Sequence, residues 1–211
     1  TGSILKPFLY ALAMDDGLLV PQTLIKDIPT QIGTFGPSNA NEDFSGLVSV
    51  KNALIYSLNV PAVRTLNSYG LEEFYFFLKH AGLTNLFRSA EDYGLPLILG
   101  GAEATPWDVA RLFRGLGRYG VFEPITYLEN DTRQTGSYPR LISPGAAYLT
   151  LEMLKELVRP GAEMYWASYQ DRFPIAWKTG TSYGRRDGWA VGVSPQWTIV
   201  VWTGNFTGEE N

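Results

Sequence analysis

The sequence contains no cysteine and only one histidine among its 211 residues. The absence of cysteine excludes disulfide bonds, thiolate nucleophiles and cysteine-based zinc sites. A Ser-His-Asp triad would have to use His80, because no other histidine is present. His80 lies near the end of Leu71–Gly82, a segment with a helical pattern, where a cation at the helix C-terminus is favourable in its own right. We therefore expect His80 to have a structural role at the end of this helix and no catalytic one.

Long apolar runs and an excess of positive charge are also missing. The longest apolar stretches, such as Leu95–Leu99 and Ile199–Trp202, fall far short of the ~20 residues that a membrane-spanning helix needs. Lysine and arginine number 17 against 21 aspartate and glutamate residues, for a formal net charge of −4. This balance offers no surface for phosphate backbones, so no nucleic acid partner is expected. A hydrophobic content of 45% suits a single globular domain over residues 1–211.

The two ends of the sequence carry no signal peptide. Thr1–Ser3 leads directly into a helical pattern, and Gly208–Asn211 follows the last expected strand without an element of its own. We expect the sequence to be a fragment of a longer chain, truncated at both ends. Any membrane attachment is then expected from a segment upstream.

Apolar spacing predicts helices in most of the chain and strands near its end. The expected helices, with proline, glycine or capping residues at their ends, cover residues 3–15, 49–56, 61–70, 71–82, 105–120 and 143–158. Residues 18–47, with several prolines, glycines and asparagines, are expected to form a long surface loop. Three β-rich segments predict an antiparallel meander over residues 174–182, 189–193 and 198–203. The expected fold class is α+β.

Three short motifs with reactive side chains follow one another along the chain. They are Ser-x-x-Lys at Ser3–Lys6, Ser-x-Asn at Ser57–Asn59 and Lys-Thr-Gly at Lys178–Gly180. At ordinary composition, about one Ser-x-x-Lys is expected by chance in this length, but Lys-Thr-Gly in well under one chain in ten. The combination of the three motifs therefore carries more weight than any one of them.

The first two motifs have the residue types of a serine nucleophile and its base. Ser3 and Lys6 share one face of the expected helix, within hydrogen-bond reach of each other. A lysine accepts a proton only where burial or a nearby positive charge lowers its pKa, and Lys178 is the candidate for that charge. Ser57 is a candidate proton relay between the lysines and a leaving group, and Asn59 is a candidate for binding a substrate amide.

The third motif is expected on an edge strand. Gly180 leaves room for a ligand backbone, so that an extended peptide can pair beside the strand. The backbone N–H groups of Ser3 and Thr181 are candidates for stabilising an oxyanion. The hydroxyl groups of Thr179 and Thr181 are candidates for holding a carboxylate.

Each of these residues also has an ordinary structural explanation. Ser3 alone is explained as a helix cap, and Ser57 and Asn59 alone are explained as bend residues. Lys178 alone is explained as an edge-strand charge that opposes aggregation. These explanations do not account for all three motifs occurring in one chain.

The ordered set of motifs resembles the signature of penicillin-binding proteins and serine β-lactamases. The longer segments Gly2–Phe8, Ser57–Val63 and Trp177–Gly184 resemble bifunctional class A penicillin-binding proteins, most of all the 1C subgroup. Leu99–Gly101 and Gly188–Gly192 extend the resemblance over essentially the whole chain. It implies a β-lactamase/transpeptidase-like antiparallel sheet covered by helices on two faces, plus a helical subdomain.

The resemblance implies a serine D,D-transpeptidase. Ser3 would attack a D-Ala-D-Ala stem peptide of peptidoglycan, an amine would resolve the acyl-enzyme, and β-lactams would acylate the same serine. No cofactor or metal is implied, and the implied location is the periplasmic or extracytoplasmic face of the bacterial inner membrane. A β-lactamase, a D,D-carboxypeptidase, and a penicillin-binding or sensor domain without turnover remain as alternatives.

Apolar residues occur on both alternations of the last expected strand, as in Ile199–Trp202. A sheet of this kind is covered on both faces, and the expected helices suffice for only part of the cover. We therefore expect exposed apolar surface beside the strands. A homodimer of the fragment through this region is the expected consequence.

Overall fold

The structure is a computed structural model that describes residues 1–126, 137–157, 174–205 and 207–209. Its helical elements are η1 Gly2–Leu5, α1 Lys6–Asp15, α2 Val50–Ile55, α3 Asn59–Tyr69, α4 Leu71–Ala81, α5 Ala90–Tyr93, η2 Leu95–Leu99, α6 Pro106–Gly117, α7 Pro144–Lys155 and η5 Tyr183–Arg185. Its strands are β1 Leu24–Asp27, β2 Gly46–Ser49, β3 Ala176–Thr181, β4 Asp187–Val193 and β5 Thr198–Gly204. No helix in these described ranges is long and apolar enough to cross a membrane.

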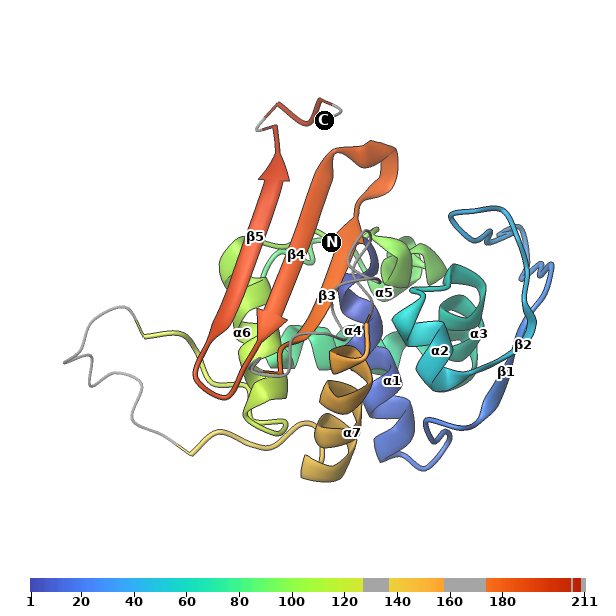
Figure 1. Cartoon of the computed structure of the whole chain (residues 1–211). Coiled ribbons are helices and arrows are strands. Elements are labelled where there is room, and N and C mark those ends of the chain that lie inside the picture. The colour runs from blue at the N-terminus through green and yellow to red at the C-terminus, as the bar shows by residue number, and fades with distance from the viewer. Residues whose placement is uncertain (127–136, 158–173, 206, 210–211) are drawn as a thin grey trace, which may run out of the picture.

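The last three strands form an antiparallel sheet in the order β3-β4-β5, which confirms the predicted meander (Figure 1). Lys178 pairs with Val191 and Gly180 pairs with Trp189, so these four side-chain positions share one face of the sheet. That face is covered by α6, which packs on β4 and β5, and by η1 and α7, which pack on β3. The N-terminus of the chain consequently lies beside β3, although about 180 residues separate them.

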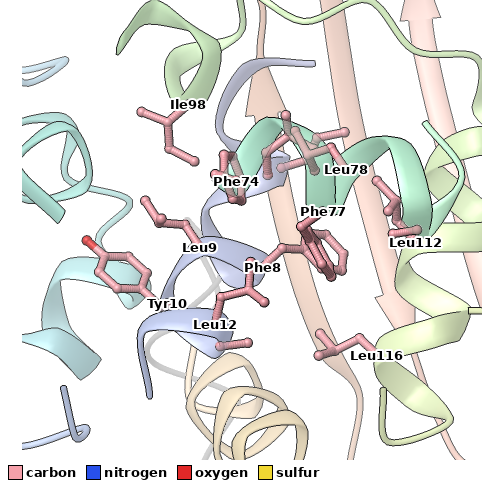
Figure 2. Packing of buried hydrophobic residues seen from close by; sticks show 14 of the residues in the cluster. Phe8, Leu9, Tyr10, Leu12, Phe74, Phe77, Leu78, Ile98, Leu112 and Leu116 are labelled. Carbon is pink, nitrogen blue, oxygen red and sulfur yellow. The ribbon is translucent and has the colours of Figure 1, made fainter. Parts of the chain in front are cut away.

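Helix α1 runs through the middle of the helical part and is buried on every side. Figure 2 shows its side chains pointing in several directions, toward α3, α4, α6 and η2. Phe8 packs edge to face on Phe113 of α6, with 5.1 Å between the ring centroids. A helix that is apolar all round belongs in a core, and each buried side chain of this size contributes about 1.5–3 kcal/mol. The start of α1 at Lys6, and the η1 turn with Ser3 directly before it, are therefore firmly anchored.

Several helix ends are those that the sequence predicts. Ser49 caps α2 by accepting a hydrogen bond from the Asn52 N–H, and Gly82 ends α4 in the left-handed conformation. Thr105 and Asp108 form a reciprocal capping box at the start of α6. Helix α6 ends at Gly117 and not at residue 120, because the chain there turns through two residues with positive φ angles. Helix α7 ends at Lys155 and not at residue 158, because the chain turns at Glu156.

The prediction of a continuous surface loop over residues 18–47 is wrong at two places. Leu24–Asp27 and Gly46–Ser49 form an antiparallel pair of strands, with Leu24 opposite Ser49 and Asp27 opposite Gly46. Each strand has only four residues and little alternation of apolar and polar side chains, so neither gives a periodic signal. The chain between them runs back toward the start of α3.

The second face of the three-stranded sheet exposes apolar side chains in the part of the chain that the structure describes. Trp197, Ile199 and Val201 are 71%, 58% and 52% exposed. They line a groove of ≈ 620 Å³ on this face. The expectation of exposed apolar surface beside the strands is thus confirmed.

Candidate active site

Two glycines let the start of the chain lie directly against strand β3. Gly2 has a φ angle of +60°, and a Cβ atom there would lie 2.4 Å from the Thr181 nitrogen. A Cβ atom on Gly180 would lie 2.6 Å from the Thr1 carbonyl oxygen. Such distances are available only to glycine. The backbone just before Ser3 is therefore in contact with the strand that carries Lys178 and Thr181.

The amine of Lys6 turns toward the bend that precedes α3. Lys6 is completely buried, and its Nζ donates to the Ser57 carbonyl oxygen and to Asn59 Oδ1, each at 2.7 Å. The sequence predicts that the Ser3 hydroxyl and the Lys6 amine come within hydrogen-bond reach, but in the part of the chain that the structure describes no hydrogen bond joins them. Ser3 lies in a turn of 3₁₀ helix and is half-buried. An ammonium group has three donors, so Lys6 keeps one beyond the two that Ser57 and Asn59 use.

The amine of Lys178 reaches the same bend from the opposite side. Only 1% of Lys178 is exposed, and its Nζ donates to Ser57 Oγ and to the Thr179 carbonyl oxygen, each at 2.8 Å. Ser57 thus accepts hydrogen bonds from two buried lysines, one through its carbonyl and one through its hydroxyl group. Residues from α1, the α2–α3 bend and β3 meet at this point.

Burial changes the proton affinity of both lysines. The pKa of Lys6 lies well below its usual value, mainly because burial penalises the charged form and further because Lys178 is positively charged nearby. Burial lowers the pKa of Lys178 to about 7. A lysine can act as a base where burial or a neighbouring positive charge lowers its pKa. Lys6 has both.

Ser57 has an unusual backbone conformation. Its φ angle is +55°, in the left-handed region that residues other than glycine seldom adopt. Such a conformation costs on the order of 1–3 kcal/mol and persists only where surrounding contacts hold it. The Ser57 N–H donates to the Leu54 carbonyl, and helix α3 begins two residues later at Asn59. This bend directs the Ser57 hydroxyl toward Lys178 and its carbonyl toward Lys6.

A family model described as "Penicillin binding protein transpeptidase domain" matches residues 1–206. The chain belongs to this family. Penicillin-binding protein 1C of Escherichia coli K12 is 37% identical to it over 98% of the chain and 26% of its own length. Penicillin-binding protein 1F of Bacillus subtilis is 30% identical over 100% of the chain and 31% of its own length. This penicillin-binding transpeptidase domain therefore spans about a quarter to a third of these relatives.

Solved structures share the fold of this penicillin-binding transpeptidase domain. Penicillin-binding protein 1A of Haemophilus influenzae matches with a TM-score of 0.78 at 22% identity, over 98% of this chain and 38% of that chain. PonA1 of Mycobacterium tuberculosis, solved in complex with penicillin V, matches with a TM-score of 0.82 at 20% identity, over 100% and 61%. These matches confirm the predicted α+β, transpeptidase-like fold, and the family model confirms the family resemblance.

The remaining predicted residues of the penicillin-binding domain lie beside this point. Asn59 uses its Oδ1 for Lys6 and donates one amide N–H to the Ser38 carbonyl at 2.9 Å. Thr179 and Thr181 are exposed, whereas Lys178 and Gly180 alternate with them on the covered face of β3. Gly180 has a structural reason to be glycine, namely its contact with the start of the chain.

His80 lies apart from these groups, on the exposed surface of α4. Its Nδ1 is 2.7 Å from the Phe76 carbonyl oxygen of the preceding turn. This is the structural place that the sequence predicts. Within the described residues, no group of three or more histidine, cysteine, aspartate or glutamate side chains has the arrangement of a metal site.

Sequence reasoning missed two buried polar residues next to the site, Asp27 and Asn39. They are 0% and 3% exposed, and Asn39 accepts hydrogen bonds from the backbone at the start of α3. Both occur in the segment predicted to be a surface loop, where asparagine and aspartate are common turn residues. Only the three-dimensional contact with a segment about 20 residues away distinguishes them from ordinary loop residues.

Proposed function

We propose that this chain is the catalytic part of a serine D,D-transpeptidase that cross-links peptidoglycan stem peptides through an acyl-enzyme. The convergence of two buried lysines, Lys6 and Lys178, on Ser57 carries this proposal. Amines with lowered pKa values are the groups that a serine needs to lose its proton near neutral pH. Membership of the penicillin-binding transpeptidase family supports the same chemistry.

Ser3 is the proposed nucleophile. Neutral Lys6 takes the proton of the Ser3 hydroxyl while Oγ bonds to the penultimate carbonyl carbon of a D-Ala-D-Ala stem peptide. The N–H groups of Ser3 and Thr181 are the proposed donors to the resulting oxyanion, supported by the contact between Gly2 and Thr181. The charge that develops on the carbonyl oxygen is thereby stabilised without any metal or organic cofactor.

Ser57 is the proposed relay to the leaving group. As the tetrahedral intermediate collapses, the carbon–nitrogen bond to the terminal D-Ala breaks and its nitrogen receives the proton from Lys6 through Ser57 Oγ. Lys178 orients this hydroxyl by donating to it. An amine of a second stem peptide then attacks the acyl-enzyme, its proton returns to Ser3 by the same groups, and the serine is regenerated.

Substrate binding is assigned to the residues around the relay. The second amide N–H of Asn59 is proposed to bind a substrate amide, because only one of the two is used by Ser38. The exposed hydroxyls of Thr179 and Thr181 are proposed to hold the substrate carboxylate, with the peptide extended along the edge at Gly180. β-Lactams are the proposed inhibitors, as the complex of PonA1 with penicillin V suggests by analogy.

The proposed location is the periplasmic or extracytoplasmic face of the bacterial inner membrane, where peptidoglycan is cross-linked. Any attachment to the membrane would come from a part of the protein outside these residues. The bacterial penicillin-binding proteins that match this chain support this location.

The decisive experiment is labelling with a fluorescent penicillin followed by mass spectrometry of the labelled peptide. We expect one adduct, on Ser3, and an adduct on Ser57 or Ser182 would overturn the assignment. Lys6→Met keeps the side-chain volume but removes the base, so it should abolish labelling. His80→Ala is the matched control and should label normally. Loss of labelling in a folded His80→Ala variant would instead point to a histidine base.

A second measurement separates cross-linking from the related activities. The protein is mixed with a D-Ala-D-Ala stem peptide and an amine acceptor peptide, and the products are identified by mass spectrometry. A cross-linked product is expected for the transpeptidase. Hydrolysed peptide alone would indicate a carboxypeptidase, and a labelled protein that releases no product would indicate a binding or sensor domain.

A further inference from the structure

The bend at Ser57 is held from behind by a buried polar pair, Asp27 and Asn39. Asp27 is fully buried at the end of β1, and Asn39 is 3% exposed in the connection from β1 to β2. Burying a carboxylate and an amide is costly unless their hydrogen-bonding groups are satisfied. Both side chains are satisfied here, and their partners lead directly to the site.

Asn39 caps helix α3 from outside the helix. The N-cap residue of α3 is Leu58, which has no side chain that can accept a hydrogen bond from the first turn. Asn39 Oδ1 takes this role, because it accepts from the Asn59 N–H at 2.9 Å and from the Val60 N–H at 3.2 Å. The start of α3, which includes one residue of the Ser-x-Asn motif, is thereby tied to the β1–β2 connection.

The orientation of the Asn39 amide is fixed by its other end. Its Nδ2 donates to Asp27 Oδ1 and to the Asp43 carbonyl oxygen, each at 2.8 Å. The second carboxylate oxygen of Asp27 accepts from the Ser45 N–H at 2.9 Å. Because both amide hydrogens point to acceptors, Oδ1 is left to face the helix. Asp27 thus determines which atom Asn39 presents to α3.

The same connection also orients the side chain of Asn59. The Ser38 carbonyl, adjacent to Asn39, accepts from Asn59 Nδ2 at 2.9 Å. Asn59 Oδ1 is consequently turned toward Lys6, which donates to it. The backbone and the side chain of Asn59 are both held by residues 38 and 39.

We infer that Asn39, oriented by Asp27, is a positioning residue that holds the Ser57–Asn59 bend where Lys6 and Lys178 can bind it. This inference rests on the proposed function, because its effect is on acyl transfer from Ser3. Asn39 reaches the chemistry only through the bend. A displacement of about 1 Å in such a group is enough to slow a reaction by a factor of about 100.

The test uses a swap of the two side chains. Asn39→Asp places two carboxylates against each other, whereas Asp27→Asn combined with Asn39→Asp restores one donor between them. The noncovalent affinity for a fluorescent penicillin and the first-order acylation rate constant are to be separated by stopped-flow. The concentration dependence of the observed rate gives the affinity, and its value at saturation gives the rate constant. Asn39→Asp should lower the rate constant about 10- to 100-fold, a larger factor than its effect on affinity, and the swap should recover part of the loss, since the Asp43 carbonyl still lacks its donor. Asn41→Asp, an exposed change of the same charge in the same connection, should leave both constants unchanged.

The outcomes separate this inference from the proposed function. Absence of a Ser3 adduct in the unaltered protein overturns the proposed function and the inference with it. A Ser3 adduct together with an unchanged rate constant in folded Asn39→Asp overturns the inference alone. A swap that folds but stays as slow as Asn39→Asp also contradicts it. If Asn39→Asp does not fold, Asp27→Asn alone decides, and an unchanged rate constant in that variant overturns the inference.

Discussion

The amines of Lys6 and Lys178 both donate hydrogen bonds to Ser57, and they would repel each other if both were fully charged. Burial lowers the pKa of both Lys6 and Lys178, and the positive charge of Lys178 lowers the pKa of Lys6 further. Their hydrogen-bond partners are neutral oxygens of Ser57, Asn59 and Thr179. A buried carboxylate beside them would stabilise the ammonium forms and raise both pKa values. Neutral acceptors therefore hold the two amines in place without raising their pKa values as a carboxylate would.

Replacing Lys178 tests how far its charge depresses the pKa of Lys6. In Lys178→Met one of the two causes of the lowered pKa is removed, so the pKa of Lys6 rises. A smaller fraction of Lys6 is then neutral at a given pH, and the acid limb of the acylation profile should move to higher pH. The maximum rate should fall about 100-fold or more, because Ser57 also loses its orienting donor. Penicillin acylation rates across a pH series measure both effects, and an unmoved limb would show that burial alone depresses Lys6.

The sequence predicts the positions of these residues where the residues that interact are close together along the chain. Ser3 and Lys6 were recognisable from a spacing of three, and their placement at a helix start was predicted correctly. The partners of Lys6 could not be predicted in the same way, since they lie 51 and 53 residues further along the chain. Asn39 gave no signal at all, because an asparagine in a polar loop is ordinary until its contact with α3 is known.

At the scale of elements, the site depends on how closely η1 approaches β3. Both elements carry a glycine at the contact, Gly2 and Gly180, and neither position has room for a Cβ atom. The meander itself was predictable from alternating β-branched and aromatic residues and from its turn residues. The motif combination pairs Ser3 with Thr181, but the direct contacts of Gly2 and Gly180 gave no local signal, because they join segments at opposite ends of the sequence.

Gly180→Ala should separate η1 from β3. Its Cβ atom would meet the Thr1 carbonyl oxygen at 2.6 Å and the Ile4 nitrogen at 3.0 Å, and backbone atoms yield less than flexible side chains. We expect penicillin acylation to slow about 10-fold or more, with a lower melting temperature. Gly192→Ala in β4 is the control, since its nearest contact is a side-chain methyl of Ile175 at 3.2 Å. Equal acylation rates in the two variants would contradict a role for this contact in the proposed oxyanion site.

At the scale of the whole molecule, the sheet has one covered face and one face with exposed apolar side chains among the described residues. Trp197 and the β5 residues Ile199 and Val201 help to line a groove on this face, at the edge of the sheet. Exposed apolar patches and open strand edges both favour association with another copy. The expectation of a homodimer remains a prediction.

A charge on this face should oppose that association. We expect the 211-residue chain to associate at high concentration, and Ile199→Lys should shift it to monomer, because a desolvated ammonium group is unfavourable in an apolar contact. Sedimentation velocity over a concentration series measures the change. Phe87→Lys removes a side chain that is 73% exposed but lies elsewhere, and it should leave the association intact. A monomer at every concentration in the unaltered chain would show that the exposed face does not drive dimerisation.

The contact between η1 and β3 also determines when, during synthesis of the chain, the candidate site can be completed. Lys6 and Ser57 leave the ribosome early, but Lys178 follows Ser57 by 121 residues, and only then does the second amine reach the bend. Contacts so distant along the chain form late and slowly, since a long loop has to close first. A nascent chain that ends before β3 would have the proposed nucleophile, Ser3, and no complete site to activate it. Under the proposed function, acylation by penicillin would then report a late step of folding, and a protein still being made would be insensitive to the antibiotic.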